Sequence, residues 1–113
     1  MGADSAFALA RLRIDIEREL RRIAHMVQVD LTVRPVGITG LARELVNKEV
    51  LPAPFAEALH EIAKVCNLGI HGERIPNDVT AAVVRVGGQV LERLRVLPVQ
   101  PPSSNEGIAT TGE

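Results

Sequence analysis

The chain has 113 residues, a formal net charge of −1, and 46% hydrophobic and 24% charged residues, which is the composition of one small globular domain. Its two Phe and the lack of Tyr and Trp exclude aromatic stacking of single-stranded nucleic acid and aromatic cages for quaternary ammonium groups. They also argue against an all-β barrel or sandwich, and the near-neutral charge argues against general electrostatic capture of nucleic acid.

The first predicted helix runs from a cap at Asp4 or Ser5 to about Val29. Its apolar residues recur at alternating short spacings typical of one buried helix face. They are Leu9, Leu12, Ile16, Leu20, Ile23 and Val27. The other side carries arginines and acidic residues and is expected to face solvent. Ile14 lies off the apolar line, and we interpret it as an ordinary exposed residue in preference to a partner contact.

A loop over residues 31–40 precedes a short second helix at 41–50, for which Thr39 is a plausible cap. Pro52 closes this helix. Pro54 then occupies a first-turn position, where proline is tolerated, and a third helix opens at about Phe55.

Asn77 or Asp78 is expected to cap the last helix, which runs to about Leu97. Its predicted apolar line contains four valines and one leucine. They are Val79, Val83, Val86, Val90 and Leu94. Gly87 and Gly88 interrupt the pattern at a cost of about 1 kcal/mol each relative to Ala. Close helix packing is our preferred explanation for the pair, and a kink is the alternative.

The sequence therefore predicts an all-α four-helix bundle over residues 1–97 and a disordered tail or linker over 98–113. Short loops favour antiparallel neighbours in such a bundle. Because an aliphatic core of this size is small, we expect association into a homodimer.

The third helix presents two lines of side chains next to each other. The apolar line consists of Phe55, Leu59, Ile62 and Cys66, and the polar row lies one residue later. This polar row consists of His60, Lys64, Asn67 and His71. If the helix ended before Gly69, His71 would leave this row and lie on the following loop.

The segment from Leu59 to Gly72, Leu-His-Glu-Ile-Ala-Lys-Val-Cys-Asn-Leu-Gly-Ile-His-Gly, resembles the end of the signature helix of the HEPN superfamily. It is most similar to the small prokaryotic branch filed as domain-of-unknown-function family 4145, in which Asn, three residues and His end a helix before a last amphipathic helix. The order of elements from about Phe7 to Leu97 follows the same pattern, and the specific part is Asn67 to Gly72.

The resemblance implies a four-helix HEPN-like fold, and for many members a dimeric, metal-independent ribonuclease with an Arg-x(4–6)-His motif. Imidazole can move the proton of a 2′-hydroxyl near neutral pH, and Arg stabilises charge on the phosphate. His71 matches the motif His, and Asn67 matches the polar residue that often follows the Arg. Cys66 stands where the Arg is expected, and a thiol cannot replace a permanent cation. Lys64 is the only cation in range, so the candidate catalytic residues are His71 and Lys64.

Simpler interpretations compete at each of these positions. His71 near a helix C-terminus can bond terminal carbonyls, and Asn67 can serve as a helix-end hydrogen bonder. His60 with Lys64 can be a solvated face, and Cys66 is better explained as a buried small hydrophobe than as a nucleophile. No HEXXH or CxxC spacing is present, so we expect neither a metal nor a cofactor.

These observations favour a non-catalytic, homodimeric interaction or nucleic-acid-associated module that binds a protein or RNA through the polar row. The alternative is a weak metal-independent endoribonuclease of toxin or defence type that uses His71. A chain cut from a larger protein, with its tail as a linker, is a third possibility. The single Cys66, the lack of a secretory signal and the absence of a long apolar stretch predict a cytoplasmic protein without membrane insertion.

Overall fold

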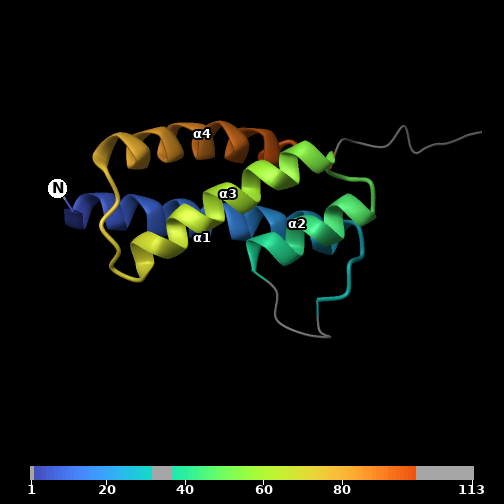
Figure 1. Cartoon of the computed structure of the whole chain (residues 1–113). Coiled ribbons are helices and arrows are strands. Elements are labelled where there is room, and N and C mark those ends of the chain that lie inside the picture. The colour runs from blue at the N-terminus through green and yellow to red at the C-terminus, as the bar shows by residue number, and fades with distance from the viewer. Residues whose placement is uncertain (1, 32–36, 99–113) are drawn as a thin grey trace, which may run out of the picture.

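The computed structural model describes residues 2–31 and 37–98, with side chains from residue 6 onward (Figure 1). Over these ranges the chain forms four α-helices and no strand. They are α1 (Gly2–Met26), α2 (Ile38–Asn47), α3 (Ala53–Ile70) and α4 (Asn77–Arg95). The all-α, four-helix prediction is confirmed, while the predicted disordered tail over residues 98–113 lies, apart from Pro98, outside the described residues.

Helices α1 and α3 each contact the other three helices. Leu12 packs against Gly87 and Arg22 reaches the carbonyl of Leu94, so α1 and α4 run in the same direction. Leu9 packs against Gly69 near the end of α3, which makes α3 antiparallel to α1. Helix α2 also runs in the direction of α1 (Figure 1), because the connection over residues 27–37 is long enough to return the chain. The antiparallel expectation is therefore wrong for α1 and α2.

The core is aliphatic, as the sequence predicts. The apolar line of α1 is buried except at its end, where Val27 is half-buried. Leu41 and Leu45 of α2 and Leu59 and Cys66 of α3 are fully buried around it. Phe55 is only half-buried at the edge of this cluster, so no aromatic ring fills the bundle centre.

The predicted apolar line of α4 is partly wrong. Val79 and Val86 are 38% and 37% exposed, whereas Thr80 and Gly87 are buried. The α4 backbone approaches α1 at Gly87, where the lack of a side chain leaves room for Leu12. This close approach turns the glycine side of α4 toward the core and leaves the neighbouring valines at the rim.

Helices α1, α2 and α4 begin earlier in the chain than their predicted capping residues would place them. Helix α1 begins at Gly2, ahead of both proposed caps, and α2 begins at Ile38 behind Gly37, so Thr39 is not a cap. Helix α3 begins at Ala53 with Pro54 in its first turn, as predicted. At α4 the N-cap is Pro76, and Asp78 accepts a hydrogen bond from the Val79 backbone N–H at 2.9 Å inside the first turn.

Helices α1, α2 and α3 end in the same hydrogen-bonded turn, in which a residue with positive φ follows the last helical turn. Gln28 (φ 66°), Glu49 (φ 62°) and Gly72 (φ 82°) occupy this position. In α2 the N–H of Glu49 donates to the Val46 carbonyl and the N–H of Val50 to the Leu45 carbonyl, both at 2.9 Å. These two bonds define a Schellman motif, which favours glycine at its positive-φ residue.

We expect Glu49→Gly to raise the free energy of unfolding by about 0.5–1 kcal/mol, because Glu49 is exposed and glycine removes the steric cost of the left-handed backbone. Lys48→Gly is the matched control, since Lys48 has φ −84° and gains nothing from glycine. Urea unfolding of both variants checks the prediction, and a loss of stability in both would contradict it.

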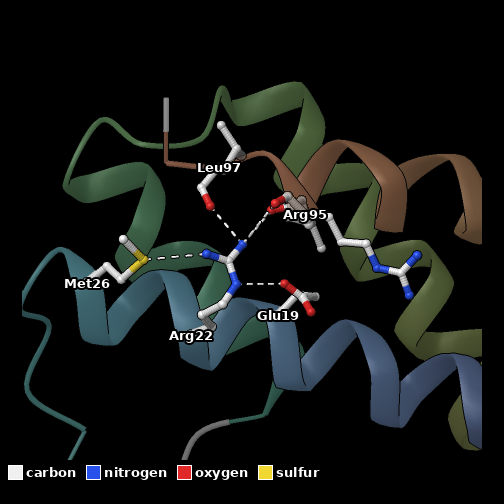
Figure 2. A network of polar contacts seen from close by, with 6 residues as sticks. Glu19, Arg22, Met26, Arg95 and Leu97 are labelled. Atoms are coloured by element: carbon white, nitrogen blue, oxygen red, sulfur yellow. Dashed lines mark hydrogen bonds and ion pairs between the residues drawn. The ribbon is translucent and has the colours of Figure 1, made fainter. Parts of the chain in front are cut away.

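Arg22 of α1 holds the C-terminal end of α4 (Figure 2). Its Nη2 atom donates to the carbonyls of Leu94 at 2.9 Å and Leu97 at 2.7 Å, and Nε donates to Glu19 Oε1 at 2.8 Å. These acceptors include carbonyls that a helix end leaves without an intrahelical partner, and a cation is also favourable there. Arg22 is thus a structural link between two helices and not part of a purely solvated face.

Candidate functional site

The polar row lies on the solvent side of α3. All four of its residues, His60, Lys64, Asn67 and His71, are exposed, while the apolar line on the other side of the helix is buried at Leu59, Ile62 and Cys66. The structure therefore brings the predicted binding residues onto one accessible surface, as their spacing indicates.

The helix continues through Gly69 to Ile70, which keeps His71 in the row as the C-cap of α3. The backbone N–H of His71 donates to the Asn67 carbonyl at 3.0 Å, so its backbone still follows the helix. Gly72 then takes the positive φ of the Schellman motif and ends the row. The helix therefore does not end before Gly69, and His71 stays in the polar row instead of lying on the following loop.

Helix α2 contributes residues to this surface that sequence reasoning missed. A hydrogen bond of 3.0 Å joins Thr39 Oγ1 to His60 Nδ1 across the two helices. A groove of about 660 Å³ follows the same α2–α3 boundary, with Arg43, Val46, Ala53, Glu57, His60 and Glu61 among its lining residues. The Thr39 hydroxyl thus holds His60 at the edge of this groove. Only the pairing of α2 with α3 puts these residues together, and no spacing within either helix signals it.

The charges on this surface are balanced. Lys64 Nζ lies 3.5 Å from Glu61 Oε1, with both side chains more than half exposed. Around the groove two basic residues, Arg43 and Lys64, stand beside two carboxylates, Glu57 and Glu61. A polyanion would meet as much repulsion as attraction here, since capture of a phosphate backbone depends on net positive charge. The arrangement fits a partner that presents both signs of charge.

Cys66 faces the core, on the opposite side of α3 from His71. It is fully buried, and this burial raises the pKa of its thiol to about 11, an effect that the positive charge of Arg13 only partly offsets. A thiol in this state is a poor nucleophile, which confirms the interpretation of Cys66 as a small core residue. A basic side chain at position 66 would likewise point away from His71.

We expect Cys66 to resist iodoacetamide in the folded protein at neutral pH and to react promptly in urea, because the thiol is both buried and protonated. Its raised pKa also links folding to pH. Burial of the neutral thiol contributes fully to the free energy of unfolding below the ordinary pKa of 9.0, and this contribution is lost as pH rises toward about 11.

Urea unfolding of the wild type and of Cys66→Ala across this pH range measures the effect. The variant should lose less stability with rising pH than the wild type does. Equal slopes, or rapid labelling of the folded protein, would contradict the prediction.

No group of three His, Cys, Asp or Glu side chains in the described ranges is arranged to hold a metal ion. Among the helices described, none is both long and apolar enough to cross a membrane.

A second pocket, of about 610 Å³, lies where α3 ends and α4 begins. Its walls include Leu9 of α1, Arg74 and Ile75 of the connecting turn, and Asn77 and Thr80 of α4. The sequence predicts only a loop here, because the pocket forms only where the N-terminal part of α1 packs against the stretch over residues 69–80, which is distant from it in sequence.

Comparison of the chain with protein-family models, with curated proteins and with solved structures found no match.

Proposed function

We propose that this chain is a non-catalytic interaction module with a HEPN-like fold, whose partner is a protein that contacts the polar row and the α2–α3 groove. The observation that carries this proposal is the balance of charge on an exposed surface that also holds a groove. The row offers hydrogen-bonding side chains to such a partner. It offers no pair of groups already arranged for acid–base chemistry on a phosphodiester.

The inward position of Cys66 supports the same proposal. The motif of HEPN ribonucleases needs a permanent cation beside the histidine, and within the row Lys64 is the only lysine or arginine. Lys64 is engaged with Glu61, and about 10 Å of helix axis separates Lys64 from His71 at 1.5 Å per residue. Catalysis by this pair would require Lys64 to leave its carboxylate partner.

We also propose that the module is a cytoplasmic homodimer. Large apolar side chains remain accessible on the described surface, including Leu68 and Ile70 beside the end of the row, at 50% and 47% exposure. Burying such residues between two copies would add to a small core. Size-exclusion chromatography with light scattering at micromolar concentration tests this part, and a strict monomer removes it.

The enzyme alternative is tested by incubating the purified protein and His71→Ala with mixed RNA in the presence of a chelator. We expect no RNA decay above buffer in either sample. Decay by the wild type that His71→Ala abolishes would overturn the non-catalytic proposal. His25→Ala is the matched control, because His25 is an exposed histidine on α1, outside the row.

The binding surface itself is tested by charge reversal. Glu61→Lys should weaken capture of a protein partner, because it removes one of the two carboxylates of this surface and the ion pair with Lys64. Strong RNA binding by the wild type in a low-salt filter assay, with a steep loss on adding salt, would instead favour the hypothesis that the polar row binds RNA.

A further inference from the structure

Thr80 has an unusual environment for a hydroxyl group. Its side chain is 6% exposed, and Oγ1 is buried without a hydrogen-bond partner among the described residues. Leaving a buried hydroxyl unpaired is costly, so such groups are uncommon in folded proteins. Thr80 also lines the 610 Å³ pocket between α3 and α4. Because Thr80 lines the pocket, rotation about its Cα–Cβ bond can turn the hydroxyl toward a ligand there, and a hydrogen bond to that ligand would satisfy it.

The N-terminus of α4 brings further hydrogen-bond donors to this pocket. The N-cap, Pro76, has no side chain that could accept from the first turn. The N–H of Thr80 donates to the Pro76 carbonyl and that of Val79 to Asp78 Oδ1, whereas no acceptor within the described chain meets the N–H groups of Asn77 and Asp78. Free N–H groups at a helix N-terminus favour a bound anion.

The remaining residues that line the pocket limit the chemical class of ligand that it can bind. Arg74 adds a guanidinium that makes no ion pair with any described residue, and Leu9 and Ile75 form apolar walls. Glu73 also lines the pocket, and its negative charge disfavours a ligand with more than one negative charge. The pocket is therefore rich in donors, tolerant of one negative charge, and apolar on one side.

We propose that this pocket binds an aliphatic carboxylate. The carboxylate oxygens accept hydrogen bonds from Thr80 Oγ1, from the first turn of α4 and from Arg74, and the aliphatic body packs on Leu9 and Ile75. Such a group can belong to a free branched-chain acid or to the C-terminal residue of a peptide. This site is separate from the polar row and does not depend on the function proposed for it.

The test is a titration of the full ¹⁵N-labelled chain followed by amide NMR. The probes are 4-methylpentanoate, the peptide N-acetyl-alanyl-leucine with a free carboxylate, and 4-methylpentanamide as the uncharged control. We expect saturable shifts at Gly72, Asn77 and Thr80 with a carboxylate probe and none with the amide. The probe that binds more tightly identifies the free acid or the chain end as the source.

Thr80→Val removes the hydroxyl but keeps the side-chain shape, and we expect it to weaken binding by at least about tenfold. Arg74→Met should weaken it similarly. Thr80→Ser retains the hydroxyl and should bind, and Arg85→Met, at an exposed arginine of α4 outside the pocket, should bind like the wild type. Thermal melts of each variant confirm folding. The absence of saturable shifts with both carboxylates, equal shifts with the amide, or unchanged binding by a folded Thr80→Val protein would overturn the proposal.

Discussion

Replacing Gly87 by Ala is expected to lower the free energy of unfolding by about 1–3 kcal/mol, whereas the same change at the adjacent Gly88 should raise it by up to about 1 kcal/mol. Both residues lie within α4, so the intrinsic gain of helix propensity is the same. The difference comes from what the new methyl group meets. Urea unfolding of the two single variants measures it.

An ideal Cβ atom at Gly87 would lie 2.9 Å from Leu12 Cδ1, 3.1 Å from Leu12 Cγ and closer still to Cδ2. Leu12 is itself 7% exposed in the core of α1, so it has little room in which to move. A methyl group at position 87 must push the two helices apart or force Leu12 out of its rotamer. At Gly88 no atom lies within 4 Å of the same ideal Cβ, so alanine meets open space.

A double-mutant cycle with Leu12→Ala isolates this contact. Leu12→Ala alone should cost about 2–5 kcal/mol, because it leaves a cavity between α1 and α4. In that background Gly87→Ala should become neutral or stabilising, since its methyl group then fills part of the cavity. The coupling between the two changes should be about 1–3 kcal/mol. Additive effects, or equal effects at Gly87 and Gly88, would show that α4 does not approach α1 here.

The sequence predicts α1 and α3 better than it predicts α4, for a reason that Gly87 makes clear. In α1 and α3 large aliphatic residues mark the buried face, so the helical period identifies it. In α4 a buried position that packs directly against α1 has no side chain, and hydrophobicity alone assigns Val79 and Val86 to the core in its place. A glycine can be a buried contact position of a helix without adding to any hydrophobic pattern.

The candidate site likewise has a part that the sequence predicts and a part that it does not. The polar row was predictable because four residues of one helix share a face by spacing alone. The contact between Thr39 and His60 and the pocket at Thr80 depend on how separate helices are placed, which no local pattern records. The direction of α2 is a further case, because the connection over residues 27–37 permits either direction.

Arg22 shows what such tertiary placement contributes to stability. We expect Arg22→Met to lower the free energy of unfolding by about 1.5–3 kcal/mol, because it removes charged hydrogen bonds to the carbonyls of Leu94 and Leu97 together with the ion pair to Glu19. Methionine keeps the length of the aliphatic part, so most of the loss reports on the guanidinium. Arg22→Lys keeps the charge but cannot serve these acceptors in a fork geometry, and it should recover only part of the loss.

Arg18→Met is the matched control, since Arg18 is an exposed arginine of the same helix with no ion pair or hydrogen bond among the described residues. Its effect should stay within about 0.5 kcal/mol. Hydrogen exchange adds a local test. Arg22→Met should speed exchange in the last turns of α4 beyond what the global loss of stability explains, because Arg22 binds carbonyls at that helix end. Equal destabilisation by both methionine variants, or unchanged relative protection in α4, would mean that Arg22 acts only as part of the solvated face of α1.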